Sequence, residues 1–155
     1  LEYICGDLFT EGYTYPDYVK NMNLLALPIE DDRFDIVICN HVMEHIPEDI
    51  KAISEIFRVL KVGGFAIIQV PISYSTERTI EDFSITNPDE RKRRFGKSDH
   101  YSIYGRDYVE RLKSVGFNVE MKNISNDFPQ YALNPEENIF ICTKPRKDRQ
   151  DPQLD

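Results

Sequence analysis

Residues 27–71 read LPIEDDRFDIVICNHVMEHIPEDIKAISEIFRVLKVGGFAIIQVP and predict more of the fold than any other part of the chain. The first strand of this segment, Phe34–Asn40, is short, rich in β-branched residues and nearly continuous in apolar character. That composition is typical of a strand buried on both faces of a parallel sheet. Residues 65–70 have the same character and are closed by Pro71. The segment therefore predicts two neighbouring buried strands.

A helix is expected between these two strands. Pro47 suits the first turn of a helix, where a missing N–H costs nothing, and Glu48 and Asp49 follow where the helix dipole favours acids. Apolar residues then recur every three or four positions from 46 to 60, which gives one apolar stripe. Gly63-Gly64 is expected to end the helix. A strand, a helix and a strand with short connections predict a βαβ unit with parallel strands and a right-handed crossover.

Further elements are expected on both sides of this unit. They are short strands over residues 1–7 and 18–25, a helix that starts in the run Thr86-Asn87-Pro88-Asp89-Glu90, a helix over residues 105–115, and strands over residues 117–124 and 138–143.

Residues 72–104 are polar, aromatic and charged, and we expect them to form an insertion that covers the substrate. One domain is expected over residues 1–145. Residues 146–155 are expected to be a disordered tail.

The composition limits the possible partners. The chain has 155 residues, of which 41% are hydrophobic and 30% charged, enough for one domain with a core. Its net charge of −8 is opposite in sign to that of proteins that wrap nucleic acid, so we expect no nucleic acid partner. No apolar run reaches the roughly 18 residues that span a bilayer, and no signal-peptide pattern is present. We therefore expect a cytoplasmic protein without a membrane partner, in which Cys5, Cys39 and Cys142 are reduced thiols.

The segment LPIEDDRFDIVICNHVMEHI, followed by EIFRVLKVGGFAIIQVP, resembles the class I S-adenosylmethionine-dependent methyltransferases, specifically the branch called methyltransferase type 11. The resemblance is strongest over residues 1–70 and continues to about residue 145. It implies an α/β fold: a Rossmann-like, mostly parallel sheet flanked by helices, with an antiparallel last strand. It also implies methyl transfer from S-adenosylmethionine to a small-molecule substrate.

Five residues at strand ends are candidates for binding this cofactor, because ligands of open α/β sheets lie at the carboxyl ends of the strands. The resemblance gives Asp7 the role of accepting hydrogen bonds from both ribose hydroxyls. It places Asn23 where the family usually has an Asp for the adenine amino group, and Leu24 beside the adenine ring. It places Asn40 and His41 along the methionine part of the cofactor. The alternatives are a loop cap for Asp7, a core position for Leu24, and ordinary turn residues for Asn40 and His41.

Two histidines are candidates for the chemistry. Methyl transfer needs in-line positioning and an acceptor in the right protonation state. His45 and His100 are the candidate general bases, with Glu44 behind them. Asp99 precedes His100, and we expect it to orient that ring. A structural or exposed role for either histidine stays open.

Residues 41–45 also fit the pattern His-x-x-Glu-His of some zinc peptidases. That chemistry needs both histidines inside one helix and a third ligand, whereas Pro47 indicates that the helix has barely begun. We therefore expect no peptidase and no metal. A weaker alternative is a divalent ion on His41, Glu44 and His45, because some related O-methyltransferases bind a metal through a Glu-x-x-Glu-His version of this motif.

A glycine-rich motif of the family is missing from the sequence. Family members hold the cofactor with a Gly-x-Gly-x-Gly loop after their first strand, and none of the seven glycines here forms it. We therefore expect a chain that is truncated at its amino end relative to the family and binds the cofactor weakly by itself. The open sheet edge is expected to form a homodimer, or to let residues 1–7 pair beside Phe34–Asn40. The rival functions are a non-catalytic binding domain on the same scaffold and a nucleotide-binding dehydrogenase.

Overall fold

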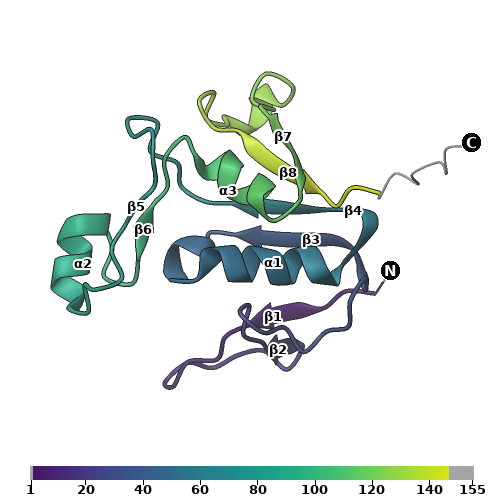
Figure 1. The fold of residues 1–155 in the computed structure, drawn as a ribbon, viewed down its shortest axis with the longest axis horizontal. Coiled ribbons are helices and arrows are strands. Elements are labelled where there is room, and N and C mark those ends of the chain that lie inside the picture. Colours follow the sequence, from purple (N-terminus) through teal and green to yellow (C-terminus); the bar gives the residue numbers. More distant parts are fainter. Residues whose placement is uncertain (1, 147–155) are drawn as a thin grey trace, which may run out of the picture.

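The computed structural model describes residues 2–146, so all but the first residue of the expected tail at 146–155 lies outside the described residues. Figure 1 shows the order of the elements. They are β1 (Cys5–Asp7), β2 (Val19–Asn21), β3 (Phe34–Asn40), the 3₁₀ turn η1 (Met43–His45), α1 (Asp49–Val59), β4 (Leu60–Gln69), β5 (Ile80–Glu81), α2 (Pro88–Phe95), β6 (Ser102–Ile103), α3 (Tyr108–Ser114), β7 (Asn118–Lys122), the 3₁₀ turn η2 (Pro129–Tyr131) and β8 (Ile139–Thr143).

The central sheet has four strands in the order β3-β4-β8-β7. β3 and β4 are parallel, with Asn40 opposite Gln69, and α1 makes the crossover between them. β8 runs antiparallel to both of its neighbours, β4 and β7. The prediction of a Rossmann-like α/β sheet with an antiparallel last strand is confirmed.

One face of this sheet carries the core. The apolar stripe of α1, including Ile53 and Ile56, and the inner side of α3, including Leu112, are fully buried in one cluster with Ile68 of β4 and Phe140 of β8. The spacing of the apolar residues in α1 therefore identified the buried side of the helix.

The expectation that β3 is buried on both faces is wrong. Cys39 is buried, but the side chains that alternate with it, Ile36 and Ile38, are 52% and 67% exposed. Both α1 and α3 pack on the same face, and among residues 2–146 no helix covers the other. An apolar strand sequence shows that burial is possible on both sides, but not that both sides are covered.

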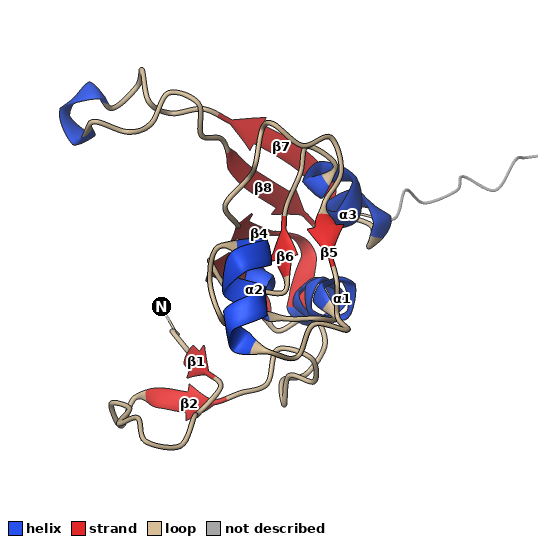
Figure 2. Ribbon diagram, turned by 90° about the vertical axis from the view of Figure 1, so that its left-hand side faces the viewer, coloured by secondary structure: helices blue, strands red, loops and turns tan. Residues whose placement is uncertain are grey.

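β1 and β2 form a separate parallel pair, apart from the four-stranded sheet (Figure 2). The expectation that residues 1–7 pair beside Phe34–Asn40 is therefore wrong: Cys5–Asp7 pairs with Val19–Asn21 instead. These two strands are close in sequence, so less conformational entropy is lost when the loop between them closes. Within the described residues, one edge of β3 is left unpaired.

A clamp on α1 holds the linker that follows β2. Arg58 donates to the carbonyl oxygens of Leu27 and Ile29 at 3.0 and 2.7 Å, and to the Asp31 carboxylate at 2.7 Å. Glu55 accepts from the Leu27 N–H at 2.8 Å and from Arg58. These contacts fix the linker to α1 and so position the small sheet.

The glycine pair does not end the helix as expected. α1 ends at Val59, and β4 begins at Leu60, so Gly63 and Gly64 lie within the strand. Gly63 has a φ of +82°, and a Cβ on Gly64 would lie 2.8 Å from the carbonyl oxygen of Asp35. The glycines therefore allow a close approach of β3 and β4 where their register shifts between Phe34 and Ile36.

Residues 72–104 contain the antiparallel pair β5–β6 and helix α2, and lie beyond the carboxyl ends of β3 and β4 (Figure 1). Asn87 caps α2 as its sequence predicts, by accepting from the N–H groups of Asp89 and Glu90. The buried carboxylate of Asp49 accepts from the Tyr104 hydroxyl and from Arg111, which joins the end of this insertion to α1 and α3. Over residues 2–146, no helix has the length and apolar content that a bilayer span requires.

Candidate functional site

Two cavities lie at the carboxyl ends of β3 and β4. The first has a volume of about 260 Å³ and is lined by Glu44, Pro71, Ile72, Ser73, Phe95, His100, Ser102 and Ile103. The second has a volume of about 290 Å³ and is lined by His41, Gln69, Val70, Pro71, Ile72, Tyr74, Asn134, Glu136 and Glu137. Pro71 and Ile72 belong to both, so the two cavities are neighbours. This is the edge at which α/β sheets bind ligands.

His41 stands at the end of β3 in the left-handed region, with a φ of +56°. Few residues without glycine's freedom adopt this conformation, and it is common at binding sites. The His41 N–H donates to the Gln69 carbonyl oxygen at 2.8 Å, which fixes the turn to β4. The His41 side chain is exposed and lines the second cavity.

Glu44 and His45 lie on the 3₁₀ turn η1, not on an α-helix. Their positions do not match the helical geometry of a zinc peptidase, as expected from Pro47. The His45 Nδ1 atom lies 3.2 Å from a carboxylate oxygen of Asp99. Asp99 therefore pairs with His45, whereas we had expected it to orient His100.

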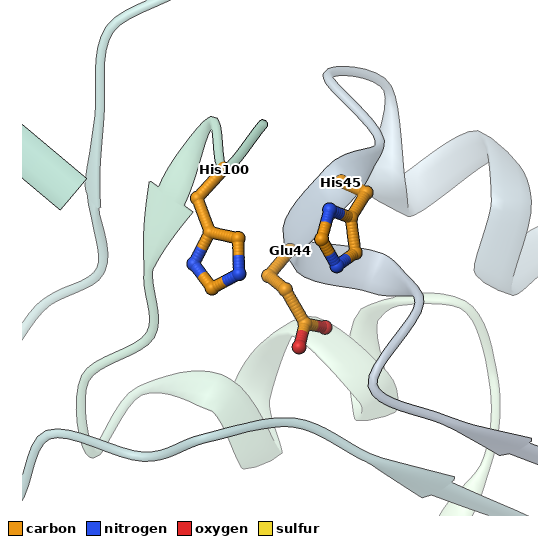
Figure 3. A group of neighbouring side chains, drawn as sticks. All are labelled: Glu44, His45 and His100. Carbon is orange, nitrogen blue, oxygen red and sulfur yellow. The ribbon is translucent and has the colours of Figure 1, made fainter. Parts of the chain in front are cut away.

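His100 lies beside His45, with ring centroids 4.7 Å apart and the planes at 87° (Figure 3). The Tyr101 N–H donates to the Glu44 carbonyl oxygen at 2.9 Å, so the backbone next to His100 is tied to η1. Burial lowers the pKa of His100, and the neighbouring His45 lowers it further. The ring is therefore neutral at physiological pH.

Two polar atoms in this group lack partners. Within the described residues, Glu44 Oε2 and His100 Nε2 are two of three buried side-chain nitrogen or oxygen atoms without a hydrogen bond. Glu44 is 3% exposed and His100 is 9% exposed. A buried polar group without a hydrogen bond lowers the stability of the fold by about 1–3 kcal/mol. Two such groups side by side therefore indicate a binding site.

The candidate cofactor residues fall into two groups. Asp7 and Asn23 are exposed and belong to the small β1–β2 sheet and the turn after it, with Leu24 half-buried against the core. Asn40 is exposed at the end of β3, next to His41. The Asn23 side-chain oxygen accepts from the Leu25 N–H at 2.9 Å, so it closes a local turn.

Sequence reasoning missed two residues of this region. Gln69 ends β4 opposite Asn40, lines the second cavity and donates from its side chain to the Asn138 carbonyl oxygen at 2.8 Å. Its position as the one polar residue at the end of an apolar strand was the available signal. Ser102 is buried beside the first cavity, and no pattern in the sequence singles it out.

A family model described as a methyltransferase domain matches residues 9–68. A protein of Mycolicibacterium smegmatis, named as a probable S-adenosylmethionine-dependent methyltransferase, is 29% identical over 104 residues, which are 66% of this chain and 35% of that protein. The chain thus spans about a third of the length of this relative.

Solved structures share the fold. The crystal structure of the [4+2]-cyclase SpnF has a TM-score of 0.56 and 18% identity, covering 83% of this chain and 57% of that one. An S-adenosylmethionine-dependent methyltransferase of Mesorhizobium loti has a TM-score of 0.51 and 14% identity, covering 83% of this chain and 70% of that one. At these identities the similarity shows the fold alone, and one fold can host more than one reaction.

Proposed function

We propose that this chain, which belongs to the class I S-adenosylmethionine-dependent methyltransferases, provides cofactor and acceptor surfaces for the transfer of a methyl group to a small molecule. One observation carries the proposal most. His41, which follows Asn40 at the end of β3, and the insertion over residues 72–104 meet around two adjoining cavities at the carboxyl ends of β3 and β4.

The residues present fit S-adenosylmethionine in part. The Asp7 carboxylate is exposed and accepts no hydrogen bond from residues 2–146, so it is available to the two ribose hydroxyls. Asn23 fits less well, because its oxygen already accepts from Leu25 and has only one lone pair left for an amino group. Asn40 and His41 would line the methionine part. When bound, the cofactor would supply an activated methyl group on a sulfonium sulfur.

The first cavity is the proposed place for the methyl acceptor. Its volume of about 260 Å³ suits a small molecule, and its lining combines apolar residues such as Phe95 with the polar groups of Ser102 and His100. The insertion contributes Phe95, His100 and Ser102, so the residues that recognise the acceptor come mainly from one segment.

His45 is one of two candidate bases: it lines neither cavity itself, but it offers an atom within 4.8 Å of atoms of Glu44 and His100, which line the first. Its Nδ1 atom faces Asp99, which favours a proton on Nδ1 and leaves Nε2 free to accept the acceptor's proton. Asp99 also stabilises the cation that this transfer creates. His100 is neutral and lies beside it, so it can accept a hydrogen bond at the same place.

Binding of S-adenosylhomocysteine to the full chain tests the cofactor assignment. We expect weak binding that Asp7→Asn and Asn40→Ala weaken further, measured by ligand-observed NMR, because each removes a group that contacts the cofactor. Glu11→Gln, which changes an exposed loop acid near Asp7 in sequence, is the matched control and should bind like the parent chain. Equal binding by Asp7→Asn and Glu11→Gln would contradict the ribose role.

We also propose that the open edge of β3 pairs with the same strand of a second copy. The edge offers unpaired backbone groups beside the exposed side chains of Ile36 and Ile38. Two identical edges can pair about a two-fold axis, which is the commonest symmetry of soluble oligomers.

A further inference from the structure

We propose that Glu44, His45 and His100 bind one divalent transition-metal ion. Each offers one ligand atom, and these atoms lie within 4.8 Å of one another. Figure 3 shows the Glu44 carboxylate below the two rings, with one nitrogen of His100 facing it. Glu44 and His45 come from η1, and His100 from the insertion, so the site would join two segments far apart in the sequence.

The unpaired atoms are the main support for this site. Glu44 Oε2 and His100 Nε2 are both buried and both lack a hydrogen-bond partner among residues 2–146. A carboxylate oxygen and an imidazole nitrogen each carry a lone pair, and a metal ion satisfies both at once. The Glu44 Oε2 atom and the His100 Nε2 atom could hydrogen-bond to each other only if one of them carried a proton. The structure shows no such hydrogen bond between these two atoms.

The surrounding residues hold the proposed ligands as metal sites usually do. Metal-binding histidines commonly donate their other ring N–H to a carboxylate, which fixes the tautomer. Asp99 stands 3.2 Å from His45 Nδ1 and can accept that hydrogen bond, which leaves His45 Nε2 for the ion. The other oxygen of the Glu44 carboxylate, Oε1, lies 3.6 Å from His41 Nδ1.

Two imidazoles and one carboxylate favour a transition metal over Mg²⁺ or Ca²⁺, which prefer oxygen ligands. A tetrahedral ion with bonds of about 2.1 Å needs ligand atoms about 3.4 Å apart. The ligand atoms lie within 4.8 Å of one another, so they need to approach by at most about 1.4 Å.

The ion would also define the acceptor, a step that rests on the proposed function. Glu44 and His100 line the cavity of about 260 Å³, so open coordination positions would face it. A hydroxyl oxygen bound there would lose its proton more readily, because a metal ion lowers the pKa of its oxygen ligands. In the metal-bound form His45 is a ligand and no longer a base, so the hydroxyl proton would pass to solvent water. The acceptor class would then be a hydroxyl-bearing small molecule.

Titration of the metal-free full chain with Co²⁺, followed by visible absorption, tests the metal site without cofactor or acceptor. We expect one Co²⁺ per chain and a rise in melting temperature on binding. Glu44→Gln and His100→Asn should each weaken Co²⁺ binding at least 100-fold, and Asp99→Asn about tenfold. Glu90→Gln is the control, because it makes the same change as Glu44→Gln at an exposed position of α2, and it should bind Co²⁺ like the parent chain.

A second measurement separates lost ligands from lost folding. Without metal, Glu44→Gln should melt at or above the temperature of the parent chain, because it removes a buried carboxylate whose Oε2 atom has no hydrogen-bond partner among residues 2–146. With saturating Co²⁺ the parent chain should have the higher melting temperature. No Co²⁺ binding by the parent chain, binding by His100→Asn equal to that of the parent chain, or a loss of binding in Glu90→Gln equal to that in Glu44→Gln would each overturn the assignment. These results do not depend on methyl transfer, so the metal site and the proposed function can fail separately.

Discussion

Arg111 donates two hydrogen bonds to the carboxylate of Asp49, at 3.0 and 2.8 Å, and so joins α3 to the first residue of α1. Asp49 is buried, and Tyr104 donates to it as well, at 2.9 Å. Arg111→Met should lower the free energy of unfolding by about 3–5 kcal/mol, because it leaves a buried carboxylate without its counter-ion. Urea denaturation near neutral pH measures this difference.

Lys113→Met is the matched control for Arg111→Met. Lys113 is on the same helix but, among residues 2–146, its side chain forms only an exposed ion pair with Glu110. The free energy of unfolding should therefore change by about 0.5 kcal/mol or less. If Arg111→Met lowers the free energy of unfolding no more than Lys113→Met does, Asp49 must have found another partner.

Glu55 should make stability depend on pH. The hydrogen bonds from Arg58 lower the pKa of the Glu55 carboxyl in the folded state. A lowered pKa contributes stability that is fully present above the carboxyl's pKa in the unfolded chain, about 4.3, and is lost as the pH falls through the folded value. Glu55→Gln should therefore cost about 1–2 kcal/mol at pH 7 and progressively less as the pH falls below about 4.3. Urea midpoints of both chains across this range measure the change. A constant difference would contradict the linkage.

The cap of α2 should control how often that helix opens. Asn87 accepts from two N–H groups at 2.9 and 3.2 Å, and Asn87→Ala should cost about 1 kcal/mol of local stability. Hydrogen exchange should then be about fivefold faster in residues 88–95 and unchanged in α1. Faster exchange throughout the chain would show instead that α2 opens only with the whole protein.

Ile38→Lys should reduce self-association. A charged side chain beside an unpaired strand discourages pairing with a second copy. Sedimentation velocity should show the parent chain as a dimer and Ile38→Lys as a monomer. Val62→Lys changes a similarly exposed apolar residue of β4 and should remain dimeric. A monomeric parent chain would contradict the proposed β3 pairing.

Local patterns predicted the elements well. The stripe of α1, the cap at Asn87 and the two parallel strands all follow from nearest-neighbour rules, and each is present. The position of Gly63-Gly64 was misread, because glycines suit a close strand approach as well as a helix end. The coverage of Ile36 and Ile38 could not be predicted, since it depends on which helices pack on that face.

The sequence predicted which residues belong to the site, but not which of them contact one another. His45 and His100 are 55 positions apart, and nothing in the sequence states that their rings touch. Asp99 was assigned to its sequence neighbour His100, whereas the fold turns it toward His45. Glu44 is buried because the insertion packs over η1. That contact joins segments far apart in the sequence, so local sequence patterns do not predict it.

The clamp formed by Arg58 and Glu55 has a consequence for cofactor choice. Asp7 and His41 lie on separate sheets, and within residues 2–146 no strand pairing sets the distance between them. The linker after β2 sets it, and Arg58 fixes that linker to α1. Substitutions at Arg58 or Glu55, near the carboxyl end of α1, would therefore shift Asp7, the residue proposed for the ribose, relative to His41, the residue proposed for the methionine part. Helix α1 would thus influence which ligand length fits the site without contacting the ligand.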